Sequence, residues 1–274
     1  MPELPEVETI RRSLLPHLVG LPILGCEIYL PKLLQNLSAE EFSQSIRGRH
    51  VEDILRRGKY LVLRLSGGYT LVVHLRMTGQ LRFVHEDAPC PPHTHIVLKF
   101  AAGMVLRYTD IRQFGYWFLA PDSGIEQVAR LERLGVEPLA LDFTVGHLEA
   151  LLSGRRGKIK AVLLDQARIA GVGNIYADEA LFGAGLHPAR AAGSLAPEEI
   201  ARLHRHLQEV LNQGILMRGT TLRDYVDGSG ESGGFQHKLK VYGQKGQPCS
   251  KCQTPIARLV IAGRGTHLCP NCQV

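Results

Sequence analysis

Four cysteines near the C-terminus constrain this chain more than any other feature. Two residues separate Cys249 from Cys252, two separate Cys269 from Cys272, and sixteen residues lie between the pairs. Such pairs let four thiolates converge on one Zn²⁺ ion, and a β-hairpin between them returns the second pair to the first. Four protein ligands leave no position for water or substrate, so we expect one structural zinc. Two disulfides are the alternative.

The composition excludes several classes of protein. A length of 274 residues is typical of about two domains, and 45% apolar with 21% charged residues indicates a folded, water-soluble chain. No apolar run approaches the roughly 18 residues that cross a bilayer, and the acidic opening MPELPEVE is unlike a secretory signal. Two isolated cysteines, Cys26 and Cys90, and no disulfide framework indicate a reducing cytoplasm. A net charge of +6 favours an anionic partner such as nucleic acid.

Strand patterns fill the first part of the chain. The runs RGKYLVLRL and YTLVVHLRM alternate in β-branched and aromatic residues, and residues 66–68 between them predict a hairpin. THIVLKF and MVLRYTD repeat the pattern across the short connection 101–103. We therefore expect a β-sandwich over residues 1 to about 120, with one leading helix in EVETIRRSLLPHL.

The pattern becomes helical beyond PDSGIEQVARLERLGVEPL, which places a boundary near residue 135. Three- and four-residue spacing of apolar residues predicts helices in HLEALL, KIKAVLLDQARI, NIYADEALFGAGL and PEEIARLHRHLQEVLNQGIL. The expected fold is thus α+β in three parts. These are a β-sandwich over 1–134, a helical domain over 135–234 that ends in the Gly-rich stretch 227–234, and a zinc hairpin over 235–274.

The N-terminus carries residues suited to covalent catalysis. A small residue such as Pro2 permits removal of Met1, and an α-amine with a pKa of about 7.7–8.0 is partly unprotonated at neutral pH. On a sugar aldehyde carbon a secondary amine gives an iminium, which acidifies the neighbouring carbon and promotes elimination. Glu3, Glu6 and Glu8 follow closely, either to move protons or only to offset a helix dipole.

Several separate motifs occur in a fixed order along the whole chain. They are PELPEVETIRR, RRGKYL, HLRMTGQL, RYTDIRQFG, GVGNIYADEALF and GRGTHLCPNCQ. In these motifs the chain resembles the formamidopyrimidine-DNA glycosylase family. That resemblance implies a cytoplasmic, monomeric repair enzyme whose partner is double-stranded DNA carrying oxidised purines or abasic sites. It would excise 8-oxoguanine and formamidopyrimidines and then cut the strand by β,δ-elimination.

The resemblance also implies roles for individual residues. Pro2 matches the family's nucleophile, Glu3 its catalytic acid and Glu6 a supporting acid. Lys59 matches a hairpin lysine that reaches the active site, and Arg264 at the tip of the zinc hairpin completes the catalytic set.

The remaining matches concern DNA. Three residues match the trio inserted into the helix when a nucleotide is turned out: Met77, Arg112 and Phe114. Four match contacts to the DNA backbone: His74, Lys160, Asn174 and Arg264. The flexible stretch MRGTTLRDYVDGSGESGGF matches a lesion-recognition loop, with Thr221, Leu222, Arg223, Asp224 and Tyr225 at its centre. Thr78 stands where some relatives carry Glu, so a lesion contact there stays open.

Two other functions are consistent with parts of this pattern. An endonuclease VIII-like glycosylase would prefer oxidised pyrimidines, but PELPE in place of PEGPE favours the purine enzyme. A zinc-ribbon protein that binds DNA without catalysis would need only the cysteines and the basic charge.

Overall fold

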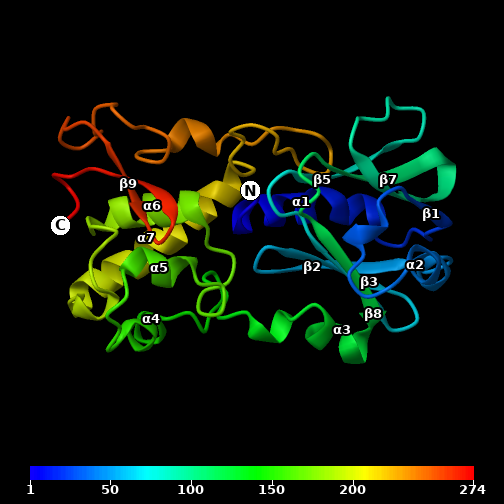
Figure 1. The fold of residues 1–274 in the computed structure, drawn as a ribbon, viewed down its shortest axis with the longest axis horizontal. Helices are drawn as coiled ribbons and strands as arrows, with labels where there is room; N and C mark the ends of the chain where they lie inside the picture. The colour runs from blue at the N-terminus through cyan, green and yellow to red at the C-terminus, as the bar shows by residue number, and fades with distance from the viewer. The chain divides into compact units, whose positions relative to one another are not determined.

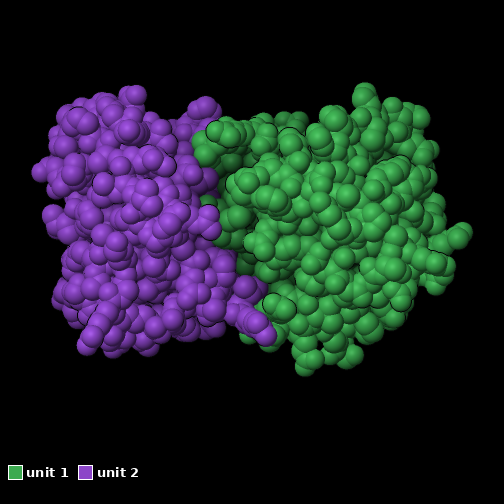
Figure 2. Space-filling model, in the orientation of Figure 1, with its two compact units in different colours: residues 1–132, 217–234 green, residues 133–216, 235–274 purple.

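The computed structural model describes residues 1–274, which form two compact units (Figure 2). Unit 1 comprises Met1–Glu132 and Met217–Gly234, and unit 2 comprises Arg133–Leu216 and Phe235–Val274. The segment Met217–Gly234, which the sequence pattern groups with the helical domain, therefore packs in unit 1, and the chain enters that unit twice. No helix is both long and apolar enough to cross a membrane.

Unit 1 contains two four-stranded antiparallel sheets, with the orders β1-β6-β7-β5 and β2-β3-β4-β8 (Figure 1). The strands are β1 (Gly25–Ile28), β2 (Val51–Arg57), β3 (Tyr60–Leu65), β4 (Tyr69–His74), β5 (Gly79–His85), β6 (Thr94–Lys99), β7 (Met104–Asp110) and β8 (Tyr116–Pro121). Both sheets contribute buried side chains to one core, among them Leu63, Leu71, Leu98, Leu106 and Trp117. This shared core confirms the predicted β-sandwich.

The predicted pairings are also confirmed. β3 and β4 form a hairpin whose turn contains Gly67 and Gly68, both at positive φ, a conformation that glycine adopts without strain. β6 and β7 pair across the short connection Ala101–Gly103. Strands β1, β2, β5 and β8 were not predicted.

The leading helix α1 (Leu4–Leu18) packs against strands β2, β3 and β5 (Figure 1). Val7, Ile10, Leu14 and Leu18 recur at spacings of three and four and are fully buried, as an amphipathic helix requires. Two shorter helices complete the unit: α2 (Ala39–Ile46) and α3 (Asp122–Val128). The predicted leading helix is thus confirmed, and its buried face fixes the N-terminus on the sandwich.

Unit 2 is helical and ends in a small hairpin. Its elements are α4 (Val145–Leu152), α5 (Ile159–Leu164), α6 (Asn174–Ala184), α7 (Pro197–Leu216), β9 (Ala257–Ile261) and β10 (Arg264–Leu268). Helix α7 spans the predicted residues. The prediction for α5 was wrong beyond Leu164, because the Gln166 side chain binds backbone groups of Leu164, Gly171 and Val172 and stabilises a loop there. Short 3₁₀ helices lie at Pro31–Leu33, Ala101–Gly103, Leu131–Arg133, Ala192–Ser194 and Phe235–Lys238.

Candidate active site

The start of the chain is held rigidly in unit 1. Met1 is exposed, whereas Pro2 is buried and Glu3 caps the N-terminus of α1. Glu3 and Glu6 form a capping box in which the Glu3 backbone N–H donates to Glu6 Oε2 at 2.8 Å. Both carboxylates are only 2% exposed. Pro2 therefore precedes a fixed helix terminus that carries two buried acids.

Glu8 lies in different surroundings. Arg11 and Arg12 donate to its carboxylate at 2.7 to 3.0 Å, and Arg56 Nε lies 3.4 Å away. Burial alone would raise the pKa of Glu8, but the hydrogen bonds and charges of the arginines outweigh it and the pKa falls. A carboxylate held ionised in this way anchors α1 and is a poor proton donor.

Glu6 also connects α1 to the segment Met217–Gly234. Its second oxygen, Oε1, accepts the backbone N–H of Thr220 at 2.8 Å. Within the segment, Thr221 Oγ1 donates to the Tyr225 carbonyl and accepts the Gly233 N–H, each at 2.9 Å. The middle of the predicted recognition loop is exposed: Leu222, Arg223 and Asp224. The segment is thus held beside Glu6 at Thr220, whereas the side chains at its tip face solvent.

Lys59 and His74 are buried neighbours on the second sheet. Lys59 lies in the two-residue turn between β2 and β3, where Gly58 adopts a φ of 55°. His74 ends β4, and its Nδ1 accepts the Arg76 backbone N–H at 3.0 Å. Burial, together with the charges of Arg76 and Lys59, lowers the pKa of His74 to about 3. The imidazole is therefore neutral near pH 7, with Nε2–H as a donor.

Met77, Arg112 and Phe114 form one exposed cluster from two loops. Met77 lies between β4 and β5, and the other two lie between β7 and β8. Met77 and Phe114 are 41% and 52% exposed although both are apolar. The Arg112 guanidinium contacts both, with Nη1 2.8 Å from Met77 Sδ and its central carbon 4.6 Å from the Phe114 ring centre. The structure thus brings this predicted trio together.

Unit 2 holds three of the predicted backbone contacts around the tip of its hairpin. Asn174 is the first residue of α6, after the N-cap Gly173, and its Nδ2 donates to the Gly265 carbonyl at 2.9 Å. Arg264 begins β10 and is exposed. Asn174 therefore fixes the backbone next to Arg264, whose charge faces solvent.

Lys160, in contrast, is fully buried. Its Nζ lies 2.6 Å from Asp178 Oδ1 and donates to Thr266 Oγ1 at 2.8 Å. Asp178 Oδ2 also accepts the backbone N–H of His267 at 2.9 Å. This ion pair joins α5 and α6 to the hairpin strand β10, so the Lys160 charge is neutralised inside the protein.

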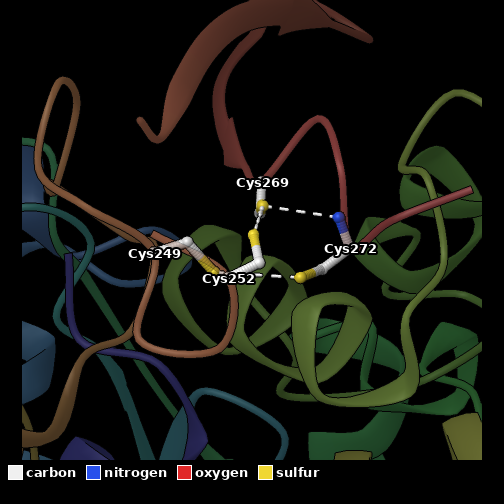
Figure 3. A group of neighbouring side chains, drawn as sticks. All are labelled: Cys249, Cys252, Cys269 and Cys272. Carbon is white, nitrogen blue, oxygen red and sulfur yellow. Dashed lines mark hydrogen bonds between the residues drawn. The ribbon is translucent and has the colours of Figure 1, made fainter. Parts of the chain in front are cut away.

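The four predicted metal ligands converge at the base of the hairpin (Figure 3). Their sulfur atoms lie within 4.8 Å of one another and form no disulfide. Cys249 and Cys272 are 3.9 Å apart at sulfur, and Cys252 and Cys269 are 3.5 Å apart. A Zn–S distance of about 2.3 Å in a tetrahedron gives sulfur separations of roughly 3.8 Å. The residues fit one structural zinc ion, as predicted, and the disulfide alternative was wrong.

Sequence reasoning missed three residues that bind the predicted site residues: Asp110, which accepts the Arg112 backbone N–H, Asp178, which pairs with Lys160, and Thr220, which donates to Glu6. Asp110 and Asp178 stand inside the motifs RYTDIRQFG and GVGNIYADEALF, and Asp178 lies in a largely apolar run, where an acid signals a buried partner. Thr220 carries no such signal, because it acts through its backbone N–H.

Family models match three parts of the chain. The formamidopyrimidine-DNA glycosylase N-terminal domain matches residues 1–117, the formamidopyrimidine-DNA glycosylase H2TH domain residues 134–226, and the zinc finger found in FPG and IleRS residues 246–274. These three matches follow the order expected from the sequence, and together they span most of the chain.

Relatives match over nearly the whole length. The formamidopyrimidine-DNA glycosylase of Moorella thermoacetica is 52% identical over 259 residues, 94% of each chain. That of Pelotomaculum thermopropionicum is 46% identical over 273 residues, 100% of this chain and 99% of the relative. Among solved structures, a complex of Lactococcus lactis Fpg with abasic-site DNA has a TM-score of 0.93 at 37% identity, and a complex of the same enzyme with N7-benzyl-Fapy-dG DNA has 0.92 at 38%, each covering 99% of both chains. These matches confirm the predicted fold and resemblance: the chain belongs to the formamidopyrimidine-DNA glycosylase family.

Proposed function

We propose that this protein excises 8-oxoguanine and formamidopyrimidines from double-stranded DNA and then cleaves the abasic strand by β,δ-elimination. Membership of the family supports this activity, and related structures hold DNA with a Fapy-dG lesion or an abasic site. The observation that carries the proposal is the buried Glu3–Glu6 capping box directly after Pro2. It places acids on a rigid helix terminus next to the expected amine.

Pro2 is the proposed nucleophile once Met1 has been removed, which a small second residue permits. The amine attacks C1′, the bond from C1′ to the damaged base breaks, and the base leaves with the bonding electron pair and takes up the proton that the amine loses. Glu3 protonates the ring oxygen as the sugar opens, and the carboxylate that remains accepts the C2′ proton in the step that follows. The resulting iminium acidifies C2′. Loss of a C2′ proton expels the 3′ phosphate, and a second elimination expels the 5′ phosphate. Glu6 supports this chemistry by holding the Glu3 backbone, and Lys59 supplies a cation to the site.

A duplex hides C1′, so the nucleotide must first be turned out, at a cost of a few kcal/mol in lost stacking and pairing. Met77 and Phe114 are proposed to fill the gap, which explains two exposed apolar side chains on one surface. Arg112 would satisfy the hydrogen bonds of the orphaned cytosine. Residues 221–225 would close over the extruded base by their backbone amides.

Phosphate contacts are proposed for His74, Asn174 and Arg264. Neutral His74 serves through its Nε2–H, and Asn174 opens helix α6, whose N-terminus favours an anion. The zinc ion contributes no chemistry, but it holds the hairpin that carries Arg264. For Lys160 we propose an indirect role in DNA binding, because its charge is paired with Asp178 inside the protein.

We propose the domain division 1–134, 135–234 and 235–274, which the family matches at 1–117, 134–226 and 246–274 support. We also propose that the protein works as a monomer in the cytoplasm, associated with the nucleoid while bound to DNA.

Borohydride trapping on an 8-oxoguanine duplex tests the proposed function. We expect a covalent protein–DNA adduct with the natural chain, because borohydride reduces the iminium at C1′ to a stable amine. Trapping should weaken with Pro2→Gly, which replaces the secondary amine of the proline ring by a primary amine on a freer backbone. DNA binding without an adduct would instead indicate a non-catalytic zinc-ribbon protein. Faster cleavage of a thymine glycol duplex than of the purine duplexes would indicate the pyrimidine-specific relative.

A further inference from the structure

A fully buried carboxylate lies beneath the exposed Met77, Arg112 and Phe114 cluster. Asp110 is the last residue of β7, and its side chain is 0% exposed. Its Oδ1 accepts the Thr78 hydroxyl at 2.5 Å and the Arg112 backbone N–H at 3.2 Å. Its Oδ2 accepts the Gly115 backbone N–H at 2.8 Å and the Tyr108 hydroxyl at 3.1 Å. One carboxylate thus organises donors from β7 and from both loops of the cluster.

Thr78 is the link between the two loops. It follows Met77 in the β4–β5 loop, and its hydroxyl oxygen also accepts the Arg112 backbone N–H at 3.0 Å. The Thr78 proton goes to Asp110, so the hydroxyl bridges the carboxylate and the loop that carries Arg112. The two loops are therefore joined at the residues adjacent to their exposed side chains.

Close packing around Tyr108 holds the β5 end of the first loop and the β8 end of the second. A Cβ built on Gly115 would lie 1.7 Å from the Tyr108 hydroxyl oxygen, and one built on Gly79 would lie 2.7 Å from the same atom. Only glycine permits such an approach without displacement of the tyrosine. Gly79 begins β5 and Gly115 directly precedes β8, so both loop ends are pressed against the donor that Asp110 accepts.

The backbone of Asp110 is fixed as well. Its N–H donates to the His93 carbonyl at 3.0 Å, and its carbonyl oxygen lies 3.0 Å from His95 Nε2. The carboxylate therefore extends from a strand end whose N–H and carbonyl are both held by hydrogen-bonding contacts outside the two loops.

We infer that Asp110 is a positioning residue that holds the two loops as one preorganised wedge, with Thr78 as the connecting side chain. This inference rests on the proposed function. Insertion into DNA by two independently mobile loops would require their ordering at the moment of base extrusion, which costs free energy. Ordering during folding removes that cost from the reaction. The same network fixes the backbone of Arg112, the residue proposed to meet the base opposite the lesion.

The test removes the link and keeps the side-chain volume. Thr78→Val loses the hydroxyl, whereas Thr78→Ser retains it and serves as the rescue variant. Tyr108→Phe removes one donor to Asp110 from a residue that is 0% exposed and so cannot contact DNA. Single-turnover excision is measured on duplexes with cytosine or adenine opposite 8-oxoguanine. A 2-aminopurine next to the lesion reports loss of stacking during insertion.

With Thr78→Val we expect excision opposite cytosine to slow about tenfold, because the variant loses both hydrogen bonds of the hydroxyl, the one donated to the Asp110 carboxylate and the one accepted from the Arg112 N–H. The fluorescence change should slow in parallel, and the preference for cytosine over adenine should fall. Tyr108→Phe should act in the same direction, and Thr78→Ser should restore most of the rate. A purely stabilising role would lower the unfolding temperature and leave the opposite-base preference and the fluorescence rate unchanged.

Two negative results are distinguishable. A natural chain that neither excises nor traps would overturn the proposed function itself. A natural chain that is active, together with a Thr78→Val variant that matches it in rate, fluorescence and opposite-base preference, would overturn this inference alone.

Discussion

Glu6 and Thr220 are 214 positions apart in the sequence, yet the Glu6 carboxylate accepts the Thr220 backbone N–H at 2.8 Å. The other oxygen of the same carboxylate accepts the Glu3 backbone N–H. One buried acid therefore holds both the proposed catalytic terminus and the start of the proposed recognition loop. A substitution of Glu6 should therefore affect both the N-terminus and the recognition loop.

Glu6→Gln cannot accept at both oxygens, because one is replaced by an amide donor that faces an N–H group. We expect excision of 8-oxoguanine to slow by about tenfold or more, which matches the cost of an unsatisfied buried donor. Limited proteolysis within residues 217–234 should also become faster. Glu52→Gln, at an exposed carboxylate of the same unit, is the control. Unchanged proteolysis in the Glu6 variant would argue against the coupling.

His74 should make the protein sensitive to acid. Its folded pKa of about 3 lies below the value near 6.5 of an unfolded histidine. Between these values the unfolded chain binds a proton that the folded chain does not, so stability falls as pH decreases below 6.5, by up to about 1.4 kcal/mol per pH unit. Urea unfolding at pH 7.5 and pH 5 measures this slope.

The matched variant is His74→Asn, which keeps an acceptor for the Arg76 N–H but does not titrate. We expect it to be less stable at pH 7.5 and to lose less stability on acidification. His50→Asn, at an exposed histidine, should retain the slope of the natural chain. An identical slope in the His74 variant would contradict the assignment.

The Lys160–Asp178 pair should matter for stability and not for the charge presented to DNA. Asp178→Asn leaves a buried ammonium without its counter-charge and should destabilise unit 2 by about 3–5 kcal/mol. Lys160→Met combined with Asp178→Leu should recover most of this loss. Urea unfolding of the single and double variants provides the measurement.

The salt dependence of DNA affinity separates Lys160 from Arg264. Each phosphate neutralised adds about −0.9 to the slope of log affinity against log salt. Arg264→Gln should therefore reduce the slope by about that amount. The Lys160 and Asp178 double variant should keep it, and a loss comparable to that of Arg264→Gln would show that Lys160 does meet a phosphate.

Zinc should be required for folding of the C-terminal region. We expect one zinc ion per chain by metal analysis, and Cys269→Ser should lower this content and the DNA affinity, because β10 carries Arg264. Cys26→Ser and Cys90→Ser, at cysteines outside the cluster, should keep one zinc each. Retention of full DNA affinity after chelation would contradict a structural role.

Local sequence patterns predicted the elements whose formation depends on neighbouring residues alone. The β3–β4 hairpin follows from alternation and two glycines, and α7 from its apolar spacing. Strand β2 was missed because its pairing with β3 across Gly58 and Lys59 is not visible in its own mixed sequence VEDILRR. The zinc ligands were found because their spacing alone fixes the geometry.

The contacts of the candidate site could not be predicted without knowing which residues far apart in the sequence meet in the fold. Residue type gives no indication that Lys160 is buried, since its partner Asp178 lies on another helix. Asp110 likewise acquires its role only when Thr78, Tyr108 and Gly115 surround it. Such networks bring together residues that are separated in the sequence, and pattern reasoning cannot place them.

Unit 1 is built from two separate segments of the chain, Met1–Glu132 and Met217–Gly234, and this limits where the protein can be divided into fragments. A fragment cut after Glu132 would keep the whole sandwich and every proposed catalytic residue of that unit, but it would lack Thr220 and the rest of Met217–Gly234. Proteolytic or genetic halves of this protein should therefore regain activity only when the second half is supplied as a separate polypeptide.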